Sequence, residues 1–404
     1  MKSLILTNEF PPNIYGGAGV HVDYLTRELA KLMNVEVRCF GSDGRTPLPT
    51  QGQLTATAYG ADVGDFKAPK QLHSIFAALQ RCLDWNSAGI DADVVHLHTW
   101  YTHLGGIFAK LNYGIPMVLT VHSLEPLRPW KREQLGGGYD FTCWVERTAL
   151  EMADAVIAVS NDTRSDILRN FDVKPEKIQV IHNGIDLNEY RKAEKNDALL
   201  RYGVDPNRPY VLFVGRITRQ KGILHLARAI HYMDKNFQIV LCAGAPDTPE
   251  IAAEMLEVVE AAQSGHGSVV WVREMVNKPD VIQLYSHASV FCCPSVYEPF
   301  GIINLEAMAC QTPVVASAVG GIKEVVVHGE TGLLVPLELK EGTFEPVDAE
   351  AFELALAQSV NTVMADSAMM DRMGLAGRAR AEQHFSWEAI AIKTHALYEG
   401  LLGK

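Results

Sequence analysis

The chain has 404 residues, of which 48% are apolar and 21% are charged, as in an ordinary globular protein rather than a disordered or fibrous one. This length exceeds what one hydrophobic core usually fills, so we expect two domains with a cleft between them. The formal net charge of −12 argues against nucleic acid or an anionic membrane as the main partner, because both require a broad basic face.

No stretch approaches the roughly 18 consecutive apolar residues of a membrane span. The apolar run that follows Met1 and Lys2 is too short for the core of a signal peptide. The seven cysteines are scattered without a C-x-x-C pair. We therefore expect a cytoplasmic protein without a membrane partner, and a homo-oligomer is possible.

Short β-rich runs alternate with longer helical patterns, which is typical of a parallel sheet wound with helices. In the first half, strands are predicted at residues 3–7, 35–40, 94–97, 117–121, 155–159 and 178–181. The rhythm restarts in the second half, with strands predicted at residues 210–214, 238–242, 269–272, 290–293, 314–316 and 332–335. The expected fold class is α/β, with two Rossmann-like, doubly wound domains.

A polar stretch at residues 188–208 has little apolar periodicity and marks the predicted domain boundary. We assign residues 1–187 to an N-terminal domain and residues 188–386 to a C-terminal domain, with a hinge near residues 186–190. A final helix of about residues 387–402 follows the second sheet.

A glycine loop follows the first strand, where residues 15–21 read YGGAGVH and open a helical pattern. Gly16 and Gly17 allow a phosphate to approach the backbone at the N-terminus of that helix, where unpaired N–H groups carry partial positive charge. A tight turn without a ligand explains this loop alone equally well. The spacing G-G-x-G differs from the dinucleotide fingerprint G-x-G-x-x-G, so a nicotinamide cofactor is disfavoured.

Histidines occur where two strands of the first half end. His122 follows the strand at residues 117–121, at the edge of the sheet where ligands bind, although a single histidine is more often structural. His96 and His98 alternate along another strand, so both rings point to one side. No third ligand follows at a recognisable spacing, and we predict no metal site.

Two cations follow the first strand of the second half, where residues 215–222 read GRITRQKG. Arg216 and Lys221 are the predicted ligands of a diphosphate, because they lie at the carboxyl end of a parallel strand and carry fixed positive charge. Arg219 lies beside them and is explained equally well as a solvated side chain.

Two carboxylates follow a later strand, where residues 298–306 read EPFGIINLE. Glu298 lies at a sharp turn with Phe300 and Gly301, and Glu306 lies about two helical turns beyond it among apolar neighbours. A carboxylate can accept both hydrogen bonds from a ribose diol, and a buried one needs such partners. The cation pair and the carboxylate pair together favour a sugar nucleotide and glycosyl transfer.

With these residues the chain resembles the GT-B retaining glycosyltransferases, in the bacterial glycogen synthase group, over nearly its whole length. Residues 15–21, 123–131 and 134–139 are similar to the actinobacterial-type members that join glucose from ADP-glucose to glucose 1-phosphate, giving maltose 1-phosphate. The resemblance implies a retaining α-1,4-glucosyltransferase of glycogen synthesis, with no cofactor or metal, whose last helix packs back on the first domain. Glycogen and starch synthases carry K-T-G-G where residues 14–17 read IYGG, which weakens the alternative of a glycogen synthase that extends an α-1,4-glucan.

The resemblance also implies roles on the donor side. Gly16 and Gly17 would approach the donor diphosphate, and Arg216 and Lys221 would bind it. Removing such a group from a developing charge costs on the order of 10²-fold in rate or more.

Further roles concern the sugar. Glu306 would hold the ribose, while Glu298 and the backbone around Phe300 and Gly301 would contact the transferred glucose. His122 would hydrogen-bond the sugar near the reacting carbon rather than act as a nucleophile.

A basic cluster near Trp130 is the candidate acceptor site. Arg128, Lys131 and Arg132 have the charge to receive the phosphate of glucose 1-phosphate, and a long glucan would have no use for them. A solvated basic loop is the alternative. Two other functional classes stay open at this point: a nucleotide-sugar 2-epimerase of the same architecture, and a non-catalytic glucan-binding protein.

Overall fold

The computed structural model describes residues 1–14, 16–42, 44–62, 64, 66–341, 343 and 345–403. The chain divides into two compact units, one of Met1–Gly184 with Trp387–Lys404 and one of Ile185–Ser386. The division thus falls between residues 184 and 185, not between 187 and 188. The backbone N–H of Ile185 donates to the carbonyl of Phe385 at 2.9 Å, and this bond joins the first residue of the second unit to its penultimate residue.

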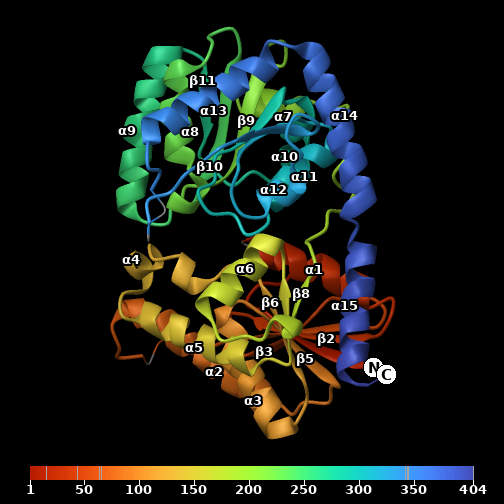
Figure 1. The fold of residues 1–404 in the computed structure, drawn as a ribbon. Helices are drawn as coiled ribbons and strands as arrows, with labels where there is room; N and C mark the ends of the chain where they lie inside the picture. The colour runs from red at the N-terminus through yellow and green to blue at the C-terminus, as the bar shows by residue number, and fades with distance from the viewer. Residues whose placement is uncertain are drawn as a thin grey trace. The chain divides into compact units, whose positions relative to one another are not determined.

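The N-terminal unit is built on an eight-stranded sheet in the order β3-β4-β2-β1-β5-β6-β7-β8 (Figure 1). Its strands are β1 Lys2–Leu6, β2 Asn34–Phe40, β3 Arg45–Leu48, β4 Leu54–Tyr59, β5 Val94–His98, β6 Met117–Val121, β7 Ala155–Ala158 and β8 Ile178–Val180. Its helices are α1 Gly17–Leu29, α2 His73–Ser87, α3 His103–Tyr113, α4 Lys131–Leu135, α5 Gly138–Met152, α6 Asn161–Asn170 and α15 Trp387–Leu401.

The six predicted strands of this half are present and pair in parallel, while β3 and β4 were not predicted. β3 lies at the sheet edge, pairs antiparallel with β4, contains Pro47 and is mostly exposed. An exposed strand with a proline lacks the apolar run of a buried parallel strand, and proline is tolerated there because an edge strand need not donate to a neighbour.

The C-terminal unit is built on a six-stranded sheet in the order β11-β10-β9-β12-β13-β14, in which every pair is parallel. Its strands are β9 Tyr210–Arg216, β10 Gln238–Gly244, β11 Val269–Val272, β12 Val290–Cys293, β13 Val314–Ser317 and β14 Gly332–Val335, all of them predicted. Its helices are α7 Asp197–Arg201, α8 Ile223–Ala229, α9 Pro249–His266, α10 Lys278–His287, α11 Ile302–Ala309, α12 Ile322–Val325, α13 Ala349–Met364 and α14 Ser367–His384.

Each sheet has a point where the strand order reverses. In the first sheet β1 lies between β2 and β5, and in the second β9 lies between β10 and β12. Ligands of open α/β sheets bind at the carboxyl ends of the strands that flank such a point. The glycine loop follows β1 and the cation-bearing segment ends β9, so both predicted phosphate-binding segments lie at these positions.

The last helix, α15, belongs to the N-terminal unit, and Figure 1 shows it in blue. The Trp387 ring stacks on Tyr24 of α1 with ring centroids 5.7 Å apart, and the Tyr398 hydroxyl bonds to Nδ1 of His96 at 2.6 Å. Both aromatic side chains are buried, so a large apolar area fixes this helix to the sheet. Among the helices that the structure describes, none combines the length and apolarity that crossing a bilayer requires.

Candidate functional site

In the C-terminal unit, two predicted site residues form an ion pair with each other. Nζ of Lys221 donates to Oε2 of Glu298 at 2.6 Å, and the Ser295 hydroxyl donates to the same oxygen at 3.3 Å. Burial, the largest influence, lowers the pKa of Lys221, but the charge of Glu298, its hydrogen bond to Lys221 and the nearby Cys293 together raise that pKa above its ordinary value. The structure therefore unites the predicted phosphate ligand and the predicted sugar ligand as one neutralised pair.

The second predicted cation also has a carboxylate partner. Nη1 of Arg216, at the end of β9, donates to Oδ1 of Asp247 at 2.8 Å. No sequence pattern selects Asp247, because it lies in the loop after β10, 31 residues further along the chain. Arg219 is half-exposed, and its Nη1 lies 3.9 Å from Oε2 of Glu254. This agrees with the alternative prediction that Arg219 is a solvated surface side chain.

The turn from Glu298 into α11 is shaped by glycines. Gly301 has a φ of +98° directly before α11, and a Cβ there would lie 2.7 Å from Nδ2 of Asn304. A Cβ on Gly320 would clash with the carbonyl oxygen of Glu298, and the N–H of Gly321 donates to that oxygen at 3.0 Å. The adjacent glycines at residues 320 and 321 thus support the Glu298 turn. The sequence prediction missed this role, although the glycine pair was a visible signal.

Glu306 lies on α11 with both carboxylate oxygens bonded to protein hydroxyls. Tyr190 donates to Oε1 at 2.9 Å and Tyr285 donates to Oε2 at 3.0 Å. Burial raises the pKa of Glu306, and the two tyrosine hydrogen bonds oppose that rise. The need for hydroxyl partners was predicted, but here the protein supplies them, so a ribose would have to share these oxygens or displace a tyrosine.

In the N-terminal unit, α1 begins at Gly17, within the predicted glycine loop. The N–H of Gly16 donates to Oε2 of Glu9 at 2.7 Å, so a carboxylate occupies the position predicted for an anion. A Cβ on Gly19 would lie 2.7 Å from the same oxygen, which explains the third glycine of the loop. Tyr15 lies outside the described residues. A diphosphate at Gly16 would have to replace the Glu9 carboxylate, which sequence reasoning did not select.

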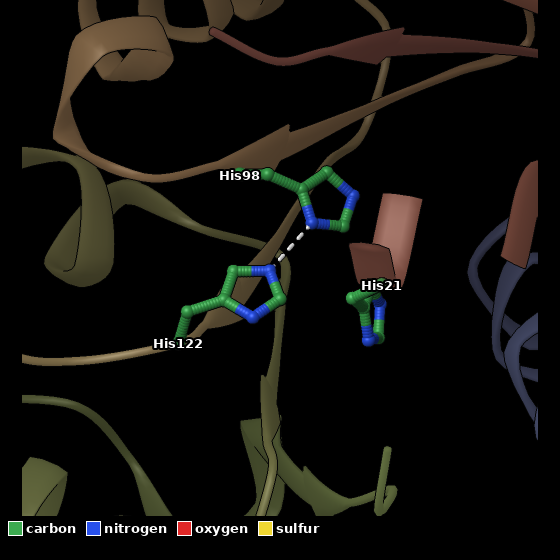
Figure 2. A group of neighbouring side chains, drawn as sticks. All are labelled: His21, His98 and His122. Atoms are coloured by element: carbon green, nitrogen blue, oxygen red, sulfur yellow. Dashed lines mark hydrogen bonds between the residues drawn. The ribbon is translucent and has the colours of Figure 1, made fainter. Parts of the chain in front are cut away.

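Three histidine rings converge in this unit, as Figure 2 shows: His21 from α1, His98 from the end of β5 and His122 directly after β6. Nδ1 of His98 and Nε2 of His122 lie 2.9 Å apart in a hydrogen bond, and Nδ1 of His21 bonds to Oδ1 of Asn183 at 2.7 Å. Burial lowers the pKa of His21 to about 4 and holds the pKa values of His98 and His122 well below 6.5. All three rings are therefore neutral at pH 7.

The ligand-capable nitrogens of His21, His98 and His122 all lie within 4.8 Å of one another. Metal bonds of about 2.0–2.1 Å in a tetrahedral site would bring them to roughly 3.3 Å. His98 and His122 already share a hydrogen bond, so the arrangement fits bonded imidazoles better than a preformed metal site. His96, the other histidine of the predicted strand pair, instead bonds to Thr120 and Tyr398. The absence of a metal stays a prediction.

The three predicted acceptor cations differ in their surroundings. Arg128 is largely buried, donates through Nη1 to the Ser123 hydroxyl at 3.1 Å and to Oε1 of Glu125 at 3.3 Å, and has a buried Nε without a hydrogen-bond partner. Arg132 is half-exposed and forms a two-bond pair with Asp140 at 2.5 and 3.1 Å.

Lys131 donates to Oε1 of Gln134 at 3.0 Å. Arg128 is therefore the cation of this cluster that the protein fixes in place.

A buried carboxylate pair, missed by the sequence prediction, organises this loop. The N–H of Glu125 donates to Oε2 of Glu146 at 2.7 Å, and the Thr142 hydroxyl donates to Oε2 of Glu125 at 3.0 Å. The Tyr139 hydroxyl donates to the Glu125 carbonyl at 2.7 Å. Burial, reinforced by the charge of Glu125, raises the pKa of Glu146 well above its ordinary value.

Comparison with known proteins places these features in a family. Residues 15–189 match the family model Glycosyltransferase Family 4, and residues 208–359 match Glycosyl transferases group 1. The chain is 48% identical over 406 residues to alpha-maltose-1-phosphate synthase from Mycolicibacterium smegmatis, with 98% of this chain and 99% of that protein covered. It is 47% identical over 402 residues to the protein of the same name from Mycobacterium tuberculosis, with the same coverage. Among solved structures, sucrose-phosphate synthase from Thermosynechococcus elongatus matches with a TM-score of 0.81 and 26% identity over 100% of both chains.

Proposed function

Since this chain belongs to the GT-B glycosyltransferases, in the family of the alpha-maltose-1-phosphate synthases, we propose that it transfers glucose from ADP-glucose to glucose 1-phosphate with retention, giving maltose 1-phosphate. It is a hexosyltransferase, and the choice of nucleotide and acceptor is the proposal. The observation that carries it is near-full-length identity of 47–48% to relatives with that name.

On the donor side, we propose that the diphosphate takes over two cations that carboxylates now hold. Lys221 would exchange Glu298 for the diphosphate, and Arg216 would exchange Asp247. The released Glu298 carboxylate would accept hydrogen bonds from glucose hydroxyls. As the bond to the anomeric carbon breaks, negative charge develops on the departing ADP, where the two cations are already positioned to stabilise it.

On the acceptor side, Arg128 is our candidate ligand of the glucose 1-phosphate phosphate group. Its buried Nε has no hydrogen-bond partner among the residues that the structure describes, and the hydrogen bonds from its Nη1 to Ser123 and Glu125 fix the guanidinium. A phosphate oxygen is a strong acceptor for such a group. The relative that matches in structure, sucrose-phosphate synthase, also has a phosphorylated sugar in its name.

We place the reaction in a reducing compartment such as the cytoplasm. All seven cysteines are free thiols, and six of them are buried. Free thiols persist where disulfides are kept reduced.

The test is to incubate the purified protein with ADP-glucose and glucose 1-phosphate and to identify the product by mass and by NMR linkage analysis. We expect ADP release and α-1,4-linked maltose 1-phosphate. Parallel reactions replace glucose 1-phosphate by a maltooligosaccharide and ADP-glucose by UDP-glucose. Extension of the oligosaccharide alone would identify a glycogen synthase and reject this acceptor, and consumption of ADP-glucose without ADP release would identify a 2-epimerase.

A further inference from the structure

The histidine cluster of the N-terminal unit carries an inference about the tautomer of His122. Its starting point is the 2.9 Å bond between Nδ1 of His98 and Nε2 of His122, drawn as the dashed line in Figure 2. A neutral imidazole has one N–H and one bare nitrogen, so one ring donates in this bond and the other accepts. Both rings are neutral, because burial holds their pKa values well below 6.5.

The other ring nitrogen of His98 decides which ring donates. Nε2 of His98 is buried, and no described residue forms a hydrogen bond with it. If His122 donated, His98 would carry its proton on this nitrogen, as a buried N–H without an acceptor. If His98 donates, the same nitrogen is a bare acceptor, and an unpaired buried acceptor is tolerated more often than an unpaired N–H.

The neighbouring ring follows the same pattern. Nδ1 of His21 lies 2.7 Å from Oδ1 of Asn183, an oxygen that can only accept, so His21 carries its proton on Nδ1. Its Nε2 is then also a bare acceptor, buried and without a partner. With both rings protonated on Nδ1, neither His21 nor His98 leaves a buried N–H unpaired.

We propose that His98 is a positioning residue that fixes His122 as the Nδ1–H tautomer, so that His122 presents a hydrogen-bond donor, and not a base, to an oxygen of the substrate. His122 is the only one of the three rings with intermediate exposure, and its Nε2 is occupied by the bond from His98. Nδ1 is therefore the atom left to meet a ligand. A sugar hydroxyl oxygen is a suitable acceptor, and this assignment of the ligand rests on the proposed glucosyl transfer.

The direct test needs no substrate. Full-length protein labelled with 15N-histidine is studied by two-bond 1H–15N correlation NMR, and the His122 signals are assigned by their loss in a His122→Gln variant. We expect protonation on Nδ1 of His122 and a bare Nε2 at pH 7.5. Protonation on Nε2 would overturn the proposal whatever the activity of the enzyme.

A matched pair of variants gives the kinetic test. His98→Asn places an N–H donor at the branch position of Nδ1, whereas the near-isosteric His98→Asp places an acceptor there. We expect His98→Asn to keep the tautomer and most of kcat. His98→Asp should draw the proton to Nε2 of His122 and lower kcat by about 10²-fold, the effect of a misplaced reacting group, with a smaller change in KM.

His96→Asn is the control for disturbing a buried histidine on the same strand, because His96 bonds to Thr120 and Tyr398 and not to His122. Thermal unfolding shows which variants are folded, and His98→Leu replaces His98→Asp if the buried carboxylate prevents folding. Equal kcat for His98→Asn and the variants without a donor would refute the positioning role. If His122→Gln keeps full turnover while the NMR result holds, the proposed contact with sugar fails and the tautomer assignment stands.

Discussion

The histidine cluster and the cation–carboxylate pairs differ in how they avoid an unbalanced charge: the histidine rings are neutral, whereas the cations are balanced by carboxylates. In the N-terminal unit, burial lowers the pKa values of His21, His98 and His122, so each ring keeps a single N–H and is neutral without a counter-ion. In the C-terminal unit, Lys221 and Arg216 each form an ion pair with a carboxylate.

The difference suits two kinds of ligand. A neutral N–H can bond to a sugar hydroxyl without attracting a stray anion. A cation held in an ion pair keeps its full charge and needs only to exchange one anion for another when a diphosphate arrives. The histidine cluster should therefore be sensitive to acid, and the ion pairs should be sensitive to the loss of a cation.

Acid should separate the two regions most strongly. Five histidines of the N-terminal unit have pKa values lowered by desolvation: His21, His96, His98, His103 and His122. Because their folded pKa lies below the unfolded value of 6.5, the stability they contribute is present above pH 6.5 and is lost as the pH falls toward about 4 and below. Each histidine protonated only in the unfolded chain costs about 1.4 kcal/mol per pH unit.

The C-terminal unit offers the contrast. There, burial alone would raise the pKa of Asp280, but its partners, foremost the hydrogen bonds from Arg201 and Tyr202, lower it. The stability that Asp280 contributes is therefore lost only below about pH 3.8. Hydrogen exchange followed by mass spectrometry at pH 7 and pH 5, corrected for intrinsic rates, should show β5 and β6 losing protection before β9 and β12. Loss from both units at the same pH would contradict this reading of the histidines.

Removing a paired cation should abolish most turnover while leaving the fold. We expect Arg216→Ala and Lys221→Ala each to lower kcat by about 10²-fold or more, because each removes a charge placed where the leaving diphosphate develops its own. Lys221→Ala should also lower the melting temperature, since it leaves the largely buried Glu298 without its cation.

Glu298→Gln in the Lys221→Ala background separates the two effects. Removing the orphaned charge should restore the melting temperature but not kcat. Arg219→Ala, which touches only a surface carboxylate, is the matched control and should be nearly silent. Normal turnover in folded Arg216→Ala and Lys221→Ala would refute the assigned roles.

Much of the fold was predictable because parallel strands are buried on both faces. The six predicted strands in each half are short runs rich in apolar residues, and all of them are present. β3 escaped prediction, since an exposed edge strand with Pro47 has no such run, and β4 was missed because its sequence LTATAY alternates apolar residues with threonines. The polar stretch from residue 188 led to a predicted boundary between residues 187 and 188, and the compact units divide three residues earlier.

The sequence predicted which residues lie at the site, but not which of them form ion pairs and hydrogen bonds with one another. Lys221, Glu298 and Arg216 could be selected because they follow strands at a ligand-binding edge, yet nothing in the sequence indicates that Lys221 holds Glu298 across 77 positions. His21 and Glu9 were missed because each acts through a contact that only the folded sheet creates. Long-range pairing of polar groups depends on three-dimensional packing, which local patterns do not encode.

The basic loop tests whether a fixed cation matters more than an exposed one. Arg128→Ala should raise KM for glucose 1-phosphate by roughly 10-fold and leave KM for ADP-glucose unchanged, because one charge-assisted hydrogen bond contributes about 1.5–3 kcal/mol. Arg132→Ala should have almost no effect, since Arg132 is exposed and paired with Asp140. Initial rates with each substrate varied in turn give both constants. Equal effects of the two substitutions would mean that net charge, not the placement of Arg128, attracts the acceptor.

Glu146 gives the opposite case, because burial and the charge of Glu125 raise the pKa of this carboxyl group. Its folded pKa lies above the unfolded value near 4.5, so the stability it contributes is present below that pH and is lost as the pH rises through the folded pKa. Glu146→Gln keeps an oxygen to accept from the N–H of Glu125 and cannot ionise. We expect the variant to match the wild type in melting temperature at pH 4.5 and to exceed it by about 2–4 °C at pH 8, the shift that roughly 1 kcal/mol produces in a unit of this size.

The sign of this pH dependence is opposite to that of the histidines in the same unit, so a scan of the wild type against Glu146→Gln from pH 4.5 to 8 separates the two contributions. A variant less stable than the wild type at pH 8 would mean that Glu146 is ionised in the folded protein.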